Sequence, residues 1–197
     1  MTEIIENRKV DFKKELSDEL VSDIAIIHKY LLHGTPILYK DKEDLYFELK
    51  QEVASFFKIS PTNVVMVGSA KLGFSIAPHK LWKNFSEESD IDIVVVSEDT
   101  FDEYWKELLD FNIKIKARSK EEDDRYRKFL EYFLKGWLRP DLFPFKYNKK
   151  STWFNFFKSI SYGNKFGNYK VAGAIFRNQY FFEKYHSTNI QKLREKI

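Results

Sequence analysis

The sequence contains no cysteine among its 197 residues. The chain therefore forms no disulfide and offers no thiolate, which excludes zinc sites built on cysteine clusters. This composition is compatible with a reducing compartment, and we expect a cytoplasmic protein. Long apolar runs are also missing: none approaches the roughly 18 residues that span a bilayer, so we expect no membrane partner. The polar, acidic segment 1–7 argues against a signal peptide.

Glycine and histidine are scarce, with 7 and 4 residues respectively. The chain has no Walker-type glycine loop, no G-x-S-x-G sequence and no Ser-His-Asp arrangement, so P-loop and hydrolase interpretations have no support. No histidine pairs with another at metal-ligand spacing. His79 differs from the others only in its place, because it lies with Lys80 between the two motifs described below. A contact of either residue with a triphosphate remains an open alternative.

Neither sign of charge is in large excess: the net charge is +3 and the pI is near 8.8, a mild basic bias. Hydrophobic residues make up 43% of the chain, which is enough for a proper core. The length fits one domain covering residues 1–197, with helical additions at its N- and C-terminal ends. We find no internal repeat, low-complexity linker or domain boundary.

Two aspartates stand out among the residues that are present. Asp90 and Asp92 lie two positions apart at the start of the apolar run Ile93–Val96, which is typical of a buried strand. Because side chains alternate along a strand, both aspartates project to one face, while Ile91 and Ile93 project to the other. Neighbouring carboxylates repel each other unless a cation lies between them, which favours a hard ion such as Mg²⁺ or Mn²⁺. The alternative is that Asp90 is a strand-entry or turn residue and that Asp92 lies on a solvated face.

A second motif lies upstream, where the short apolar run Val64–Val67 ends in Gly68-Ser69. A strand that leads into Gly-Ser and then into a helix start offers backbone N–H groups and a hydroxyl to an anion. Gly68 permits close approach of a phosphate, Ser69 can donate a hydrogen bond to it, and Lys71 can add positive charge. The two motifs together predict a nucleotide-binding and metal-binding site.

At these residues the chain resembles the DNA polymerase β-like nucleotidyltransferase superfamily, specifically its small bacterial members. The superfamily pattern is an apolar strand, Gly-Ser, a spacer and then Asp-x-Asp among apolar residues. The match covers residues 64–97, about a sixth of the chain. The spacer of 20 residues between Ser69 and Asp90 is longer than in the commonest members, and we expect its segment 74–88 to form a loop over the nucleotide.

The resemblance implies a metal-dependent nucleotidyltransferase. Asp90 and Asp92 would be catalytic and hold two Mg²⁺ ions, and Gly68 and Ser69 would bind the triphosphate of an NTP or dNTP, with ATP among the candidates. A hydroxyl would attack the α-phosphate and release pyrophosphate. The acceptor is a nucleotide or growing oligonucleotide, an RNA end or a protein hydroxyl. The resemblance also implies a role in antiviral defence or a toxin–antitoxin system, where a partner protein is common.

The superfamily usually adds a third carboxylate from a later strand, and here the sequence departs from it. The best later strand, 170–176, contains no acid. Asp110 precedes the alternating segment 111–116, a possible strand, and Asp141 lies in an irregular stretch after Pro140, where a turn residue is the favoured interpretation. The rival hypothesis is therefore a catalytically degenerate module that binds a nucleotide, a nucleic acid or a partner protein.

A basic and aromatic span, residues 143–170, contains no acid. Lysines for phosphates and aromatic rings for bases are the components of a groove for single-stranded nucleic acid. This span tilts the expected product toward a nucleotide or oligonucleotide. The favoured interpretation, which is compatible with that one, is a core helix carrying Trp153, Phe156, Phe157 and Ile160 at helical spacing.

The remaining pattern predicts a mixed α/β (α+β) fold, in which several helices flank a small mixed sheet. Strands are expected at 64–67, 93–96 and 170–176, the first two carrying the motifs. Apolar residues recur at helical spacing in five segments, which are 12–32, 43–57, 101–109, 121–138 and 179–197. Thr100 is a plausible N-cap. The acidic cluster 121–124 resembles a metal site, but first-turn acids that favour the helix dipole explain it better.

Overall fold

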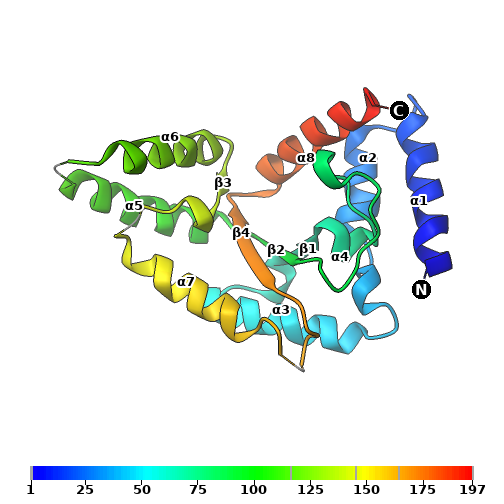
Figure 1. The fold of residues 1–197 in the computed structure, drawn as a ribbon, viewed down its shortest axis with the longest axis horizontal. Helices are drawn as coiled ribbons and strands as arrows, with labels where there is room; N and C mark the ends of the chain where they lie inside the picture. The colour runs from blue at the N-terminus through cyan, green and yellow to red at the C-terminus, as the bar shows by residue number, and fades with distance from the viewer. Residues whose placement is uncertain (1, 116, 145, 164, 197) are drawn as a thin grey trace.

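The computed structural model describes residues 2–115, 117–144, 146–163 and 165–196. A four-stranded mixed sheet lies at the centre of the molecule, with helices on both faces (Figure 1). Its strand order is β1-β2-β4-β3. These strands are β1 (Val64–Val67), β2 (Ile91–Val96), β4 (Val171–Phe176) and the two-residue β3 (Trp137–Leu138). The predicted mixed α+β architecture is confirmed.

The sheet contains both parallel and antiparallel strand pairs. β2 runs antiparallel to β1 and parallel to β4, and β3 runs antiparallel to β4. The end of β1 therefore lies beside the beginnings of β2 and β4. Both sequence motifs come together at this edge of the sheet, because Gly68-Ser69 follows β1 and the two aspartates begin β2.

Helices make up most of the described chain. The longer ones are α1 (Thr2–Ser17), α3 (Glu43–Phe57), α5 (Glu98–Lys114), α6 (Lys120–Leu134), α7 (Asn148–Ser159) and α8 (Gln179–Arg194). The short ones are α2 (Asp23–Ile27), α4 (Gly68–Leu72) and the single π turn η1 (His28–Leu32). Four 3₁₀ turns complete the set: η2 (Ile37–Tyr39), η3 (Pro61–Asn63), η4 (Pro78–Lys80) and η5 (Pro140–Leu142).

Alternation along β2 divides the core into two layers. Ile91, Ile93 and Val95 are buried in a cluster with residues of α3, α5, α6 and α7. Val94 is buried in a second cluster, with residues of α1, α2, α4 and α8. Because side chains two positions apart share a face, Asp92 projects toward the second layer together with Val94.

The prediction of one helix over 12–32 is wrong. A break at residues 18–22 separates α1 from α2. The Asp18 carboxylate accepts a hydrogen bond from the Leu20 amide at 2.9 Å, and the Ser22 hydroxyl caps α2 by accepting from Ala25 N at 3.2 Å. These polar side chains compete with helical hydrogen bonds. Leu20, one of the apolar residues at helical spacing in this segment, is consequently 95% exposed.

Three local predictions in the middle of the chain also need correction. The N-cap of α5 is Ser97, whose hydroxyl accepts from the Thr100 amide, so Thr100 is not the cap. Residues 111–114 continue α5 and form no strand, while residue 116 lies outside the described residues. The helix expected over 121–138 ends at Leu134, because Gly136 adopts a φ of +63° and the chain then enters β3.

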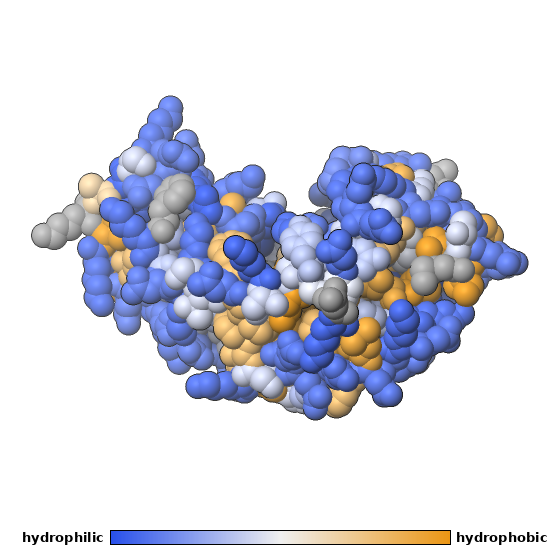
Figure 2. Space-filling model, turned by 60° about the horizontal axis from the view of Figure 1, so that its bottom comes forward, coloured by the Kyte–Doolittle hydropathy of each residue, from blue (hydrophilic) through white to orange (hydrophobic). Residues whose placement is uncertain are grey.

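Two groups of helices project on opposite sides of the sheet. α5 and α6 extend to one side, and α1, α2 and α8 stand on the other (Figure 1). The space-filling view shows a hollow between two raised lobes, and hydrophilic residues cover most of this face (Figure 2). Within the described ranges, no helix combines the length and the apolar character that a bilayer crossing requires.

Candidate functional site

The candidate site lies where β1 ends and β2 and β4 begin. The register pairs Val67 of β1 with Asp92 of β2, and Asp92 in turn with Ala172 of β4. Gly68 follows Val67 directly and starts the one-turn helix α4. The structure therefore brings Gly68, Ser69 and Asp92 to one edge of the sheet, although 22 residues separate Ser69 from Asp92 in the sequence.

The backbone of Gly68 lies against the Asp92 side chain. Its φ is +69°, a conformation that side-chain-bearing residues rarely adopt. A Cβ atom added at this position would lie 2.7 Å from Asp92 Oδ2. Position 68 thus requires glycine for two reasons: the backbone conformation of the turn from strand to helix, and the space beside the Asp92 carboxylate. Ser69, the next residue, is half-buried.

The Asp92 carboxylate lies in an unusual electrostatic environment. Burial is the largest cause that raises the pKa of Asp92 to about 6, followed by repulsion from Asp90, whereas Lys170 and Lys80 lower it. The residue nevertheless keeps an exposed surface, so neighbouring protein crowds the carboxylate without excluding water completely. A crowded, accessible carboxylate beside a second one gains stability from an added cation.

Asp90 already has a cationic partner. Lys170 Nζ lies 3.2 Å from Asp90 Oδ2, and both side chains are about half exposed. The two residues occupy matching positions, since each immediately precedes its strand and Ile91 N donates to the Lys170 carbonyl at 2.8 Å. This pair is the main contact at the site that sequence reasoning missed. The contact follows from the parallel pairing of β2 with β4, which places the residues that precede the two strands side by side.

Lys71 lies elsewhere, and the expectation that it helps to hold phosphates is not supported. Its side chain is only 1% exposed, and its ammonium group donates to the backbone carbonyls of His33, at 2.7 Å, and Gly34. Burial lowers the pKa of Lys71 to about 8, and the positive charges of Arg8 and Lys50 contribute. Lys71 therefore fixes the chain after η1 to α4.

Lys80 is a second lysine, besides Lys170, whose charge acts on Asp92. It ends η4 in the segment between Gly-Ser and the aspartates, and it is exposed. This segment is anchored to α1: Lys9 Nζ donates to Asn84 Oδ1 at 2.6 Å, and Phe12 contacts Trp82 with ring centroids 6.2 Å apart.

Among the residues that the structure describes, no third carboxylate joins the pair. Asp110 is exposed on α5. Asp141 forms a two-point ion pair with Arg139, with its shorter contact at 2.7 Å. Ala172 occupies the β4 position beside Asp92. Across the described ranges, no three histidines or acids gather where they could hold a metal ion together.

The residues at the sheet edge nevertheless fit a hard divalent ion. Both carboxylates supply oxygen ligands, and the space that Gly68 leaves beside Asp92 would be filled by any side chain. Mg²⁺ and Mn²⁺ commonly take one or two carboxylates and complete their shell with water and substrate phosphates. Two protein carboxylates therefore suffice for an ion that a triphosphate also coordinates.

The basic and aromatic span contributes mainly core and ion pairs. Trp153 and Phe157 of α7 are buried, as the core-helix interpretation requires. Lys149 pairs with Glu107 at 2.6 Å, and Lys165 pairs with Glu52 at 2.6 Å. Acids from distant parts of the chain thus compensate lysines that look unopposed in the sequence. The span consequently lends little support to a nucleic-acid groove.

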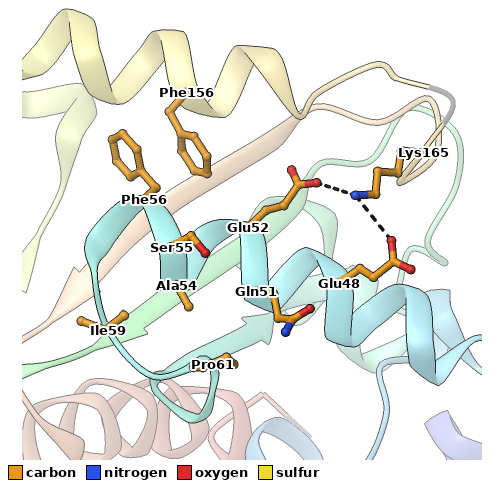
Figure 3. A pocket seen from close by; sticks show the side chains of 10 residues that line it. All are labelled: Glu48, Gln51, Glu52, Ala54, Ser55, Phe56, Ile59, Pro61, Phe156 and Lys165. Carbon is orange, nitrogen blue, oxygen red and sulfur yellow. Dashed lines mark hydrogen bonds and ion pairs between the residues drawn. The ribbon is translucent and has the colours of Figure 1, made fainter.

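A separate groove of about 820 Å³ lies between α3 and α7 (Figure 3). The rings of Phe56 and Phe156 stack there with centroids 4.0 Å apart, and Lys165 bridges Glu52 and Glu48 at its side. Its lining does not include either aspartate of the sheet edge. The open groove has volume but lacks the paired carboxylates and the glycine turn, so the sheet edge is the better candidate.

No family model matches the sequence, and no curated protein and no solved structure matches the chain.

Proposed function

We propose that the protein is a metal-dependent nucleotidyltransferase with a fold of the DNA polymerase β-like type. It would transfer a nucleotidyl group from an NTP or dNTP to a hydroxyl acceptor. The observation that carries the proposal is the position of Gly68 against Asp92, with a Cβ-to-Oδ2 distance of 2.7 Å for any residue larger than glycine. An anion-binding turn and a metal-binding carboxylate must lie side by side if one ion is to contact both the protein and the phosphates.

Each residue of the site has a role in this proposal. Asp92 and Asp90 supply carboxylate oxygens to Mg²⁺ or Mn²⁺, and the backbone of Gly68 and the hydroxyl of Ser69 bind the triphosphate. Lys80, in the segment anchored to α1, adds positive charge that acts on Asp92. A bound divalent ion lowers the pKa of the attacking hydroxyl and stabilises the departing pyrophosphate.

The reaction forms one bond and breaks one. The acceptor oxygen bonds to the α-phosphorus, the bond from that phosphorus to the bridging oxygen of pyrophosphate breaks, and the hydroxyl proton passes to water. The turn at Gly68 and Ser69 holds the phosphates in place while this exchange occurs. Nucleotides or oligonucleotides, RNA ends and protein hydroxyls remain the candidate acceptors.

The second candidate function is a module that binds a nucleotide or a partner protein without catalysis. Two observations favour it: Ala172 lies beside Asp92 in the sheet, and Lys170 forms an ion pair with Asp90. Such a module would retain the anion-binding turn and bind nucleotide, but it would release no pyrophosphate.

The test is incubation of the full chain with each labelled NTP and dNTP in Mg²⁺ or Mn²⁺, with detection of pyrophosphate and labelled products. We expect release that falls by at least about 100-fold in Asp92→Asn. Asp141→Asn is the matched control, because it removes the same charge from a residue engaged with Arg139. Nucleotide binding without release, across all nucleotides and candidate acceptors, would favour the module.

A further inference from the structure

The pair of Asp90 and Lys170 is built into the register of the sheet. Asp90 precedes β2 and Lys170 precedes β4, and the two strands pair in parallel from Ile91 and Val171 onward. A backbone hydrogen bond of 2.8 Å, from Ile91 N to the Lys170 carbonyl, fixes the two segments just beyond the charged residues. Lys170 therefore arrives at Asp90 through strand pairing and not through a flexible loop.

The same strand lacks an acid where a second ion would need one. Ala172 is the β4 residue in register with Asp92, and Lys170, which immediately precedes β4, lies beside Asp90. β4 thus offers a methyl group and a fixed positive charge to the site. Two ions held in one site require several shared carboxylate oxygens, and here the chain provides two carboxylates of which one is already paired.

The local charges point the same way. Asp90 and Asp92 carry negative charge, and Lys170 and Lys80 both act on Asp92 with positive charge. One divalent ion added to this set is attracted by Asp92 and by the incoming phosphates. A second ion at Asp90 would have to displace Lys170 or lie next to it, and two cations at contact distance repel each other.

We propose that Lys170 is a resident cation on Asp90, so that the site takes a single divalent ion, held chiefly by Asp92. Lys170 neutralises the carboxylate that a second ion would otherwise bind and holds Asp90 in position. The inference about the number of ions rests on Asp92 as a metal ligand, which the proposed function shares. It does not depend on catalysis.

The experiment measures Mn²⁺ binding to the full chain by equilibrium dialysis, together with the electron paramagnetic resonance spectrum, in the presence of a triphosphate analogue with a non-hydrolysable α,β bond. For the wild-type chain we expect one protein-dependent Mn²⁺ and the spectrum of an isolated ion. For Lys170→Met we expect a second Mn²⁺ and the broadened spectrum of two ions about 4 Å apart. Asp92→Asn should lose the Mn²⁺ of the wild type.

Two further variants separate charge from side-chain loss. Lys170→Arg keeps a cation beside Asp90 and should retain a single Mn²⁺. Lys165→Met removes a lysine that also pairs with carboxylates, those of Glu52 and Glu48, and should leave the wild-type count unchanged. A circular dichroism spectrum equal to that of the wild type shows that each variant is folded.

The outcomes distinguish this inference from the proposed function. Two coupled ions in the wild type with intact pyrophosphate release would overturn the role of Lys170 and leave the nucleotidyltransferase standing. One ion that depends on Asp92, with no pyrophosphate release, would support Lys170 and favour the non-catalytic module. A Lys170→Met variant that still binds one isolated ion would overturn the inference, and no Mn²⁺ binding at all would overturn both.

Discussion

At the scale of single residues, Gly68 shows how a motif and its physical reason can differ. The sequence predicts that Gly68 allows a phosphate to approach the backbone, and this remains a prediction. The structure adds a reason that the sequence does not reveal: the positive φ and the 2.7 Å approach of a Cβ to Asp92 Oδ2. A side chain here would strain the backbone and displace the carboxylate that we assign to the ion.

Gly68→Ala should therefore destabilise the protein by about 1–2 kcal/mol in urea unfolding. Gly34→Ala is the matched control, because Gly34 has a φ of +72° but nothing within 4 Å of an added Cβ. Its cost should be about 1 kcal/mol, from backbone strain alone. In an Asp92→Ala background the two glycine substitutions should cost the same. A persistent difference there would contradict the contact that we describe.

His186 is a second residue whose environment has a measurable consequence. Its ring lies 4.4 Å from that of Phe182, centroid to centroid, and its Nε2 atom is buried without a hydrogen-bond partner. Burial lowers the pKa of His186 to about 4. The unfolded chain, with the ordinary histidine pKa near 6.5, thus binds the proton more readily than the folded protein between these two values.

Stability should consequently fall as the pH drops through 6.5 toward 4, and the contribution of His186 should be about 2 kcal/mol at pH 5. His186→Phe removes the titrating group and keeps an aromatic ring in the apolar site. We expect the free energy of unfolding of the variant to gain about 2 kcal/mol relative to wild type between pH 7.5 and pH 5. Urea titrations at both pH values provide the measurement, and parallel changes in the two proteins would contradict this assignment.

Residue-scale prediction failed at Lys71 for a physical reason. The residue follows the Gly-Ser motif, and a sequence cannot show that its ammonium group meets the carbonyls of His33 and Gly34, which lie more than 35 positions away. Lys170 was overlooked for a related reason, because its pairing with Asp90 depends on the register between two distant strands. Contacts of this kind are set by tertiary structure.

At the scale of secondary-structure elements, strong apolar periodicity predicted where helices occur but not always where they end. The apolar stripe over 43–57 predicted α3 with the observed bounds. The similar spacing over 12–32 was misleading, because Asp18 and Ser22 supply local caps that divide the segment. Short polar side chains that bond to the backbone therefore decided where a helix stopped.

The end of α3 offers a prediction at this scale. Lys58 follows the last helical residue in the left-handed conformation, with a φ of +56°, and its amide donates to the Ser55 carbonyl. Glycine adopts this conformation without steric cost, so Lys58→Gly should stabilise the protein by about 0.5–1 kcal/mol. Lys58→Ala retains the strain and should change stability by less than about 0.5 kcal/mol. Thermal unfolding of both variants compares the two, and equal effects would contradict a conformational origin.

At the scale of the whole molecule, the sequence predicted the fold class but not the strand pairing. The three longer strands were identified as apolar runs, and β3 was missed because it has only two residues, Trp137 and Leu138. Strand order depends on long-range hydrogen bonds that no local pattern encodes. The two motifs were expected to lie together, because each stands at the end of a strand, and Gly68 does lie against Asp92. The roles assigned to these residues remain predictions.

One arginine, Arg194, links the C-terminal helix α8 to the break between the N-terminal helices α1 and α2. Arg194, in the last turn of α8, pairs with Asp23 Oδ1 at 2.9 Å and donates to the carbonyls of Leu16, at the end of α1, and of Asp18 and Val21, in the break between α1 and α2. The N-terminal and C-terminal helices lie on the same side of the sheet (Figure 1). This single side chain thus provides hydrogen-bond donors to two backbone carbonyls in the break between α1 and α2.

Arg194→Met should destabilise the whole molecule by about 2–4 kcal/mol, because it leaves Asp23 and several carbonyls without their donor. Arg194→Lys should recover less than half of this loss, since an ammonium group cannot reproduce the guanidinium fork. Lys192→Met, on an exposed position of the same helix, should stay within about 0.5 kcal/mol of wild type. Urea unfolding of the three variants checks this, and equal stability of Arg194→Met and Lys192→Met would refute this link.

The central claim is that Asp92 holds a divalent ion beneath a triphosphate seated at Gly68 and Ser69. Crystals of the full chain soaked with Mn²⁺ and a non-hydrolysable triphosphate analogue test it most directly, through the anomalous signal of the metal. We expect a peak within about 2–2.5 Å of an Asp92 carboxylate oxygen, with phosphate density at the start of α4. Ordered nucleotide and metal at another surface, with Asp92 free of both, would contradict it.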